Sequence, residues 1–270
     1  MDYRDHRIDV HGVPVQVLQG GTGPDLVYLH SAGGEVAWLP FFDLLAQDFT
    51  VHVPAHPGFA GSEGLERIDS IHDLVFHTID ALDALGLERP HVVGLSLGGW
   101  LAAELAVHHR ERVAGLVLFD PVGLSTDGGP PYADFFAASP AQLRHLVFAD
   151  GDSEVARTYM PDEPTPEALM EALKAMQATA RVAWDPFAHD PKLGDRLYRV
   201  QAPTTIVWGE KDRLADVAHA RRWQAGIQGS QLVTLAQCGH APPFESPEEA
   251  AGLVRKALGA RQGSTPAPAS

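Results

Sequence analysis

Residues 91–100 read HVVGLSLGGW and place a serine, Ser96, between two glycines at the junction of two elements. The apolar residues before Ser96 predict a strand, and the apolar spacing from Leu97 to His109 predicts a helix. A strand that turns at once into a helix strains the residue at the turn, and the small residues Gly94 and Gly98 let neighbouring chain pass. We therefore expect Ser96 to be displayed above a sheet edge, beside backbone N–H groups at a helix N-terminus.

Outward from this junction, short β-rich runs alternate with helical patterns, which is typical of a parallel α/β sheet rather than of a sandwich or a helix bundle. Nearly continuous apolar runs predict strands covered on both faces at residues 25–30, 49–54, 91–94 and 113–119. An antiparallel hairpin is expected before them, with its turn at His11-Gly12.

Two predicted helices carry start and stop signals. The helix before the 91–94 strand has Ser70 as its expected N-cap and Gly86 as its end. The last helix has Ser246 as its expected N-cap, Pro247 at its first position and Gly259 after its end. These signals bound helices long enough to cover a sheet.

The strand rhythm stops after about residue 125, where prolines punctuate short helical patterns, and it resumes at residues 204–208 and 231–235. The segment between therefore interrupts one sheet and is not a second C-terminal domain. We predict an α/β core of residues 1–124 and 196–262, a helical insertion of residues 125–195 and a disordered tail of residues 263–270.

The composition excludes several classes of protein. The chain has 270 residues, 45% hydrophobic and 20% charged, as in a packed globular protein. Its formal net charge of −15 opposes binding to phosphate backbones and anionic bilayers, so we expect no nucleic-acid and no membrane partner. The single cysteine, Cys238, excludes an intramolecular disulfide framework. Without a signal peptide or an apolar run of spanning length, a cytoplasmic protein is expected.

A serine hydroxyl is a weak nucleophile at neutral pH, so Ser96 requires a base within hydrogen-bond reach. Among the 14 histidines, His240 stands in a loop after the last predicted strand, where parallel sheets place their sites. His108 and His109 end a helix, and interaction with the helix dipole explains them. Solvated or structural roles are expected for His52, His56, His189 and His219. We therefore predict His240 as the base, and no spacing of ligands indicates a metal.

The carboxylate that orients the base has two main candidates, each after a strand. Asp212 lies in the loop after the 204–208 strand, and Asp120 ends the 113–119 strand. The order Ser96, Asp212, His240 matches the serine–aspartate–histidine order of one hydrolase class, which favours Asp212. Asp120 remains the alternative, and Glu210 is a third choice.

Five segments together resemble the α/β-hydrolase superfamily, and the resemblance spans the chain from the first hairpin to the last helix. The matched segments are residues 30–34, 56–62, 94–98, 209–212 and 239–240. The resemblance implies a mostly parallel eight-stranded sheet with helices on both faces and a helical cap inserted after strand six. Capped serine esterases and meta-cleavage product hydrolases, which break C–C bonds, are the similar groups within it.

The resemblance also implies an oxyanion hole. In that superfamily one N–H comes from a loop that begins with a His-Gly pair, and the other comes from the residue after the nucleophile. These groups correspond to the N–H groups of Ala32 and Leu97. Ser31 replaces the usual first glycine, which leaves open whether Ser31 or Ala32 donates. Each such donor stabilises a tetrahedral intermediate by about 3 kcal/mol.

Together, the residues and the resemblance imply a serine hydrolase that cleaves carboxylic esters with apolar groups through Ser96, His240 and Asp212 and an acyl-enzyme. A C–C bond hydrolase is the main alternative, and lactonases, perhydrolases and acyltransferases use the same residues. A hydrolase-like binding protein without turnover belongs to a different class. The expected partner is a small molecule with a carbonyl group, and neither a cofactor nor a metal is expected.

Overall fold

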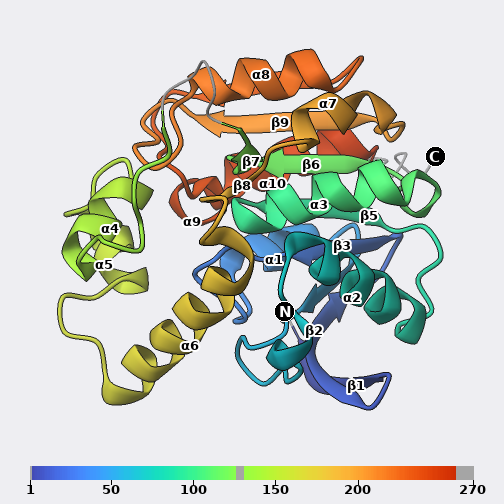
Figure 1. Ribbon diagram of the computed structural model, residues 1–270, viewed down its shortest axis with the longest axis horizontal. Coiled ribbons are helices and arrows are strands. Elements are labelled where there is room, and N and C mark those ends of the chain that lie inside the picture. Colours follow the sequence, from blue (N-terminus) through green and yellow to red (C-terminus); the bar gives the residue numbers. More distant parts are fainter. Residues whose placement is uncertain (1, 126–130, 260–270) are drawn as a thin grey trace, which may run out of the picture.

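The computed structural model describes residues 2–125 and 131–259, and a single large sheet runs through its centre (Figure 1). The sheet has eight strands in the order β1-β2-β4-β3-β5-β6-β9-β10. They are β1 (Tyr3–Val10), β2 (Val13–Gly21), β3 (Asp25–Leu29), β4 (Thr50–Pro54), β5 (His91–Leu95), β6 (Leu116–Phe119), β9 (Thr204–Gly209) and β10 (Gln231–Leu235). Strands β1 and β2 pair antiparallel, as do β2 and β4, and every other pair is parallel. The predicted fold class is confirmed.

Helices cover both faces of the sheet because side chains alternate along each buried strand. On β5, Val92 belongs to one apolar cluster and Val93 to the other. The first cluster packs against α2 (Ile71–Ala84), α3 (Leu97–His108) and α8 (Ala218–Gly226). The second packs against α1 (Pro40–Leu45) and α10 (Pro247–Leu258). Each fully buried valine or leucine contributes about 1.5–3 kcal/mol, so these two clusters hold the three layers together.

The helix boundaries follow the local signals with one exception. Ser70 Oγ accepts a hydrogen bond from Asp73 N at 3.2 Å, so the predicted cap of α2 is present. Helix α10 begins at Pro247 as predicted, but the Ser246 side chain makes no capping hydrogen bond. The backbone of Ser246 has a ψ of 62°, whereas that of the capping residue Ser70 has a ψ of 165°. The Ser246 hydroxyl instead accepts a hydrogen bond from Cys238 Sγ at 3.3 Å.

A helical insertion separates β6 from β9. Its longer helices lie to one side of the sheet, at the left of Figure 1, whereas its last short helix lies beside α8. Its elements are β7 (Gly123–Leu124), α4 (Pro140–Val147), α5 (Glu154–Tyr159), α6 (Pro166–Ala183), β8 (His189–Asp190), α7 (Leu193–Arg196) and the 3-10 helix η3 (Leu197–Arg199). Strands β7 and β8 pair in parallel, so the insertion leaves and re-enters the core at one place. The predicted disordered tail, residues 263–270, lies outside the described residues.

Shorter helices complete the chain: η1 (Leu65–Arg67), η2 (Arg110–Arg112) and α9 (Pro242–Glu245). Within the described part of the chain, no helix has both the length and the apolarity that crossing a bilayer requires.

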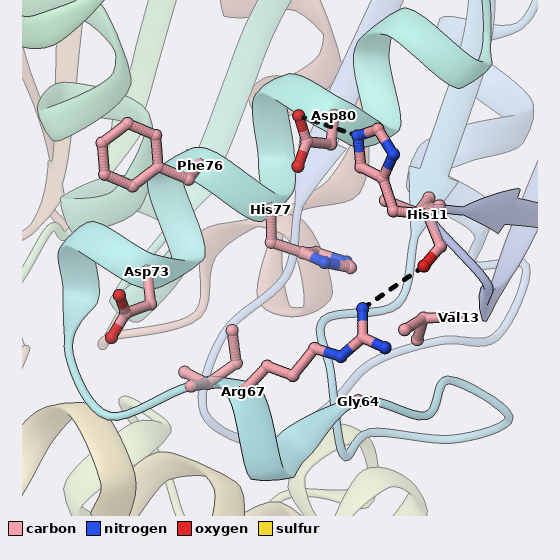
Figure 2. A pocket seen from close by; sticks show the side chains of 10 residues that line it. His11, Val13, Gly64, Arg67, Asp73, Phe76, His77 and Asp80 are labelled. Atoms are coloured by element: carbon pink, nitrogen blue, oxygen red, sulfur yellow. Dashed lines mark hydrogen bonds and ion pairs between the residues drawn. The ribbon is translucent and has the colours of Figure 1, made fainter.

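The β1–β2 hairpin packs against α2 and leaves a small surface pocket between them (Figure 2). The turn residues His11 and Gly12 have φ angles of 52° and 81°, which a tight hairpin turn requires. His11 Nε2 lies 3.5 Å from Asp80 Oδ1, and Arg67 Nη1 donates to the His11 carbonyl at 3.3 Å. These contacts hold the β1–β2 hairpin at the edge of the sheet.

The junction between β5 and α3 generates a stability prediction. A Cβ added at Gly98 would lie 1.9 Å from the Leu29 carbonyl oxygen, whereas at Gly252, in α10, it would meet nothing within 4 Å. Gly98→Ala should lower the free energy of unfolding by about 3 kcal/mol or more. The matched control Gly252→Ala should raise it by about 0.5–1 kcal/mol. Urea unfolding measures both values, and wild-type stability in Gly98→Ala would contradict the geometry.

Candidate active site

Ser96 occupies the sharp turn between β5 and α3. Its φ of 54° and ψ of −113° lie outside the usual regions for a residue with a side chain, at a cost of about 1–3 kcal/mol. A Cβ at Gly94 would lie 2.2 Å from the Gly98 carbonyl oxygen. The turn can close because both positions are glycine, and neither position admits a larger residue. Ser96 N donates to the Phe119 carbonyl at 2.9 Å, which fixes the turn to the end of β6.

Three side chains from distant parts of the chain meet at this turn. Ser96 Oγ lies 2.7 Å from His240 Nε2, and His240 Nδ1 lies 2.7 Å from Asp212 Oδ2. Asp212 follows β9 and His240 follows β10, and these strands are parallel neighbours. All three residues are buried. With neutral His240, Nδ1–H donates to Asp212 and the serine hydroxyl donates to Nε2, the arrangement needed to move a proton off the hydroxyl.

The Asp212 carboxylate is held in place by its own loop. Oδ1 accepts from the backbone N–H groups of Leu214 at 2.8 Å and Ala215 at 2.9 Å. These bonds leave Oδ2 directed at the imidazole. The carboxylate therefore fixes the orientation of the His240 ring.

A second carboxyl group, Asp120, lies against Asp212 inside the protein. Gly209 N donates to Asp120 Oδ1 at 2.8 Å, while Oδ2 is buried without a hydrogen-bond partner among the described residues. Burial first, and then the charge of Asp212, raise the pKa of Asp120 well above its usual range. Two adjacent buried carboxyl groups ionise together only at a high cost, so the neutral form of Asp120 is favoured.

Atoms of Asp120, Asp212 and His240 that can bind a metal lie within 4.8 Å of one another. Both ring nitrogens of His240, however, are already hydrogen-bonded, one to Ser96 and one to Asp212. This cluster therefore fits proton transfer better than metal binding.

Two backbone N–H groups, those of Ala32 and Leu97, are the candidates for an oxyanion hole. Leu97 is the first residue of α3, where helix N–H groups have no partner within the helix. Among the described residues, neither Leu97 N nor Ala32 N makes a hydrogen bond. Free N–H groups beside a buried hydroxyl are the usual elements of an oxyanion hole.

The loop after β3 is held by an internal carboxylate. Ser31 N donates to Glu35 Oε2 at 2.8 Å, and Ser31 Oγ donates to Glu35 Oε1. Ser31 Oγ also accepts from Gly33 N at 2.9 Å. Since the Ser31 N–H is used in this way, the geometry favours Ala32 over Ser31 as the free donor of the loop.

Glu35 is also an acidic group whose pKa is shifted by its surroundings. Burial raises the pKa of Glu35, while hydrogen bonds from Ser31 and the charge of His240 act in the opposite direction. This electrostatic coupling shows that Glu35 lies near the base. Glu35 stands five positions after His30 in the sequence, but the direction of its side chain depends on the backbone conformation of the loop.

Two buried histidines, His30 and His56, support the loop after β3. His30 Nδ1 donates to the Ser31 carbonyl at 2.8 Å, and His30 Nε2 accepts from His56 N at 2.9 Å. Their rings lie 3.8 Å apart between centroids. Burial lowers the pKa of His30 to about 4 and that of His56 well below its usual value. Both are therefore neutral and act as fixed hydrogen-bonding groups.

The insertion takes part in holding His240. The backbone N–H of His240 donates to the Val147 carbonyl at 2.6 Å. Glu245 links the same segments, because its Oε2 accepts from Ala149 N at 2.7 Å and its Oε1 from Gly239 N at 2.8 Å. The end of α4 therefore determines where the histidine loop lies.

Arg213, next to Asp212, connects the acid loop to the same segment. Its Nη1 donates to the carbonyls of His145 at 2.9 Å and Phe148 at 3.0 Å, and its Nη2 donates to Ala149 at 3.0 Å. Residues 145–149 of the insertion thus hold the loops that carry Asp212 and His240.

The structure separates the sequence candidates for the orienting acid. Asp212 contacts His240 directly, whereas Asp120 lies behind it and bonds to Gly209. Glu210 is exposed and accepts from Thr234 Oγ1 at 2.7 Å, away from the imidazole. Sequence reasoning missed Glu35 altogether.

Comparison with known proteins adds four findings. A family model described as "Alpha/beta hydrolase family" matches residues 10–253. The dihydrolipoyllysine-residue acetyltransferase component of an acetoin cleaving system from Cupriavidus necator is 30% identical, over 93% of this chain and 68% of that protein. The 2-hydroxy-6-oxo-6-phenylhexa-2,4-dienoate hydrolase of Comamonas testosteroni is 27% identical, over 89% of this chain and 90% of that one. The crystal structure of a serine hydrolase involved in carbazole degradation has a TM-score of 0.78 at 25% identity, covering 96% of this chain and 100% of that chain.

The protonated state of Asp120 generates a pH prediction. Since its folded-state pKa is raised, the neutral form contributes stability below the unfolded pKa of about 4, and this contribution is lost as the pH rises toward the folded value. Asp120→Asn keeps an acceptor for Gly209 N and cannot titrate. From about pH 4 to pH 8 the free energy of unfolding of the wild type should fall relative to that of Asp120→Asn. Urea unfolding at several pH values measures this, and a difference independent of pH would show that Asp120 ionises normally.

Proposed function

The chain belongs to the alpha/beta hydrolase family, and on that premise we propose that it is a serine hydrolase that cleaves carboxylic esters with apolar groups. The observation that carries the proposal is the unbroken chain of short hydrogen bonds from Ser96 through His240 to Asp212, each 2.7 Å long. A buried hydroxyl, an imidazole and a carboxylate in this order are the groups that acyl transfer to serine requires.

In the proposed reaction, Ser96 Oγ attacks the ester carbonyl carbon while its proton passes to His240 Nε2. The carbonyl oxygen becomes an alkoxide and accepts hydrogen bonds from Ala32 N and Leu97 N. When the intermediate collapses, the C–O bond to the alcohol breaks, and His240 gives its proton to that oxygen. Asp212 stabilises the imidazolium throughout.

Water completes the cycle. It attacks the acyl carbon of the Ser96 ester as His240 Nε2 takes a proton from it. Collapse of the second intermediate releases the acid, and the serine oxygen regains its proton from His240. Atoms balance without any external redox partner, because one ester and one water give one acid and one alcohol.

The preference for apolar groups rests on what surrounds the loop after β3. A Cβ at Gly34 would lie 2.8 Å from the ring of Phe59 and 3.7 Å from Ala175 Cβ on α6. Phe59 packs with Ala175 and Ala178 in a small buried cluster. The insertion therefore presents apolar side chains to the loop that carries Ala32, which supports its role as a cap over the site.

A C–C bond hydrolase is the second candidate. It is favoured by the similarity to the Comamonas testosteroni dienoate hydrolase, which spans nearly the whole of both chains. A dienoate, however, carries a carboxylate, and Glu35 near His240 opposes a second negative charge at pH values above its raised pKa, where its own carboxyl group is ionised. A neutral ester meets no such repulsion, so ester cleavage is the function we place first.

The nucleophile assignment is tested with Ser96→Ala. Removing the attacking oxygen should lower kcat for p-nitrophenyl butyrate by at least about 10⁴-fold. Labelling by a fluorophosphonate probe should disappear as well. Ser230→Ala, which removes a hydroxyl from a partly exposed loop residue, should retain both. Circular dichroism verifies folding, and unchanged turnover in folded Ser96→Ala would refute the assignment.

The charge argument is tested with Glu35→Gln, which keeps an acceptor for Ser31 N. For a p-nitrophenyl ester with a free carboxylate in its acyl group, kcat/KM should rise about tenfold at low salt. For p-nitrophenyl butyrate it should change little. The exposed acid Glu66 supplies the control variant Glu66→Gln. Equal changes for both esters would show that Glu35 acts only on the loop and does not discriminate by charge.

A further inference from the structure

We propose that His72, Glu104 and His108 bind one Zn²⁺ ion at a site separate from Ser96. His72 lies in the first turn of α2, and Glu104 and His108 lie one turn apart near the end of α3. One ligand atom from each residue can be chosen so that all three lie within 4.8 Å of one another. The proposal is independent of the proposed hydrolase activity.

The separations between these atoms suit a tetrahedral ion. His108 Nε2 lies 3.5 Å from Glu104 Oε2. With zinc–nitrogen and zinc–oxygen bonds of about 2.0–2.1 Å, two ligands of a tetrahedral zinc lie about 3.4 Å apart. The His72 and His108 rings are perpendicular, with centroids 5.2 Å apart, so small side-chain rotations bring both rings to one ion.

The buried carboxylate of Glu104 is the second observation that indicates a ligand. Glu104 is fully buried, with a relative exposure of 0%. Its Oε1 accepts from Trp100 Nε1 at 3.1 Å, but Oε2 has no hydrogen-bond partner among the described residues. A buried carboxylate oxygen without a partner is costly. A cation on Oε2 would remove that cost.

The two imidazoles provide access from solvent. The His72 and His108 side chains are 39% and 38% exposed, so an ion can reach the buried Glu104 without unfolding. Two imidazole nitrogens and one carboxylate oxygen are ligands that Zn²⁺ accepts, with water completing the fourth position.

Charged neighbours set the expected strength of the site. Asp190 Oδ2 lies 3.4 Å from His72 Nε2 and 3.3 Å from Arg196 Nη1. The Arg196 charge is thus partly balanced by Asp190, and Arg199 adds a second, more distant positive charge. Both arginines weaken the attraction for a dication, so we expect a lower affinity than these ligands would give without them.

A bound ion would connect α2 to α3 beside β8, the strand that closes the insertion. Because the ligands come from separate helices, binding stabilises the folded state alone. At a hundredfold excess over Kd, Zn²⁺ should raise the Tm by about 5 °C.

The test uses the full chain without an affinity tag, stripped with EDTA. Equilibrium dialysis against Zn²⁺, followed by metal analysis, should give one ion per chain. His72→Ala and His108→Ala should each weaken binding by at least about tenfold. Glu104→Gln, which keeps the acceptor for Trp100 Nε1, should do the same. His145→Ala, which removes a 49% exposed histidine on α4, is the matched control and should bind as the wild type does.

Two results would overturn the proposal. One is folded wild-type protein that retains no Zn²⁺ in dialysis. The other is stoichiometry and affinity that stay at wild-type values in both His72→Ala and His108→Ala, since these partly exposed residues can be replaced without disturbing the core. A rise of Tm with Zn²⁺ in the wild type that is lost in both variants supports the site independently of dialysis.

Discussion

The hydrogen bond between Ser96 Oγ and His240 Nε2 joins residues 144 positions apart in the chain. It can form because neighbouring parallel strands end at the same edge of the sheet. Leu95 pairs with Phe119, Phe119 with Val207, and Gly209 with Leu235. Because carboxyl ends of parallel strands share one edge, the loops after β5, β9 and β10 leave the sheet together. A slip of one residue in any of these pairs would turn side chains to the opposite face and separate the serine from its base.

Burial then determines which of the assembled groups carries charge. Asp212 has two backbone N–H donors on one oxygen and the imidazole on the other, whereas Asp120 has a single N–H donor. Burial and the neighbouring Asp212 carboxylate raise the pKa of Asp120 well above its usual range, so its neutral form is favoured. The Asp120 φ of 42° adds local strain at the end of β6. Such strain persists only where surrounding packing enforces it.

The sequence predicts the sheet, the strand–helix turn and the positions of Ser96, Asp212 and His240, because each follows from local patterns and from the shared edge of parallel strands. It does not predict the clamp between Arg213 and the end of α4, because that clamp consists of bonds to backbone carbonyls, which every residue possesses. The missing cap at Ser246 has a similar origin. Serine is a common N-cap residue, but the Ser246 hydroxyl contacts Cys238 instead of the helix N-terminus. The tertiary contact therefore outweighs the local preference.

The attachment of the insertion is uneven, and this bears on how the site is built. Around residues 145–149, carbonyl and amide groups bond to His240, Arg213 and Glu245, each bond contributing about 1 kcal/mol. The second half of α6 meets the core through apolar contacts, with Ala175 and Ala178 in a small cluster and Val182 and Ala183 in the main one. The first half of α6 is exposed, and the exposed ion pair between Arg181 and Asp69 contributes little to its attachment. Displacing the end of α4 would remove the bond that positions His240, which makes this stretch part of the site itself rather than a cover over it.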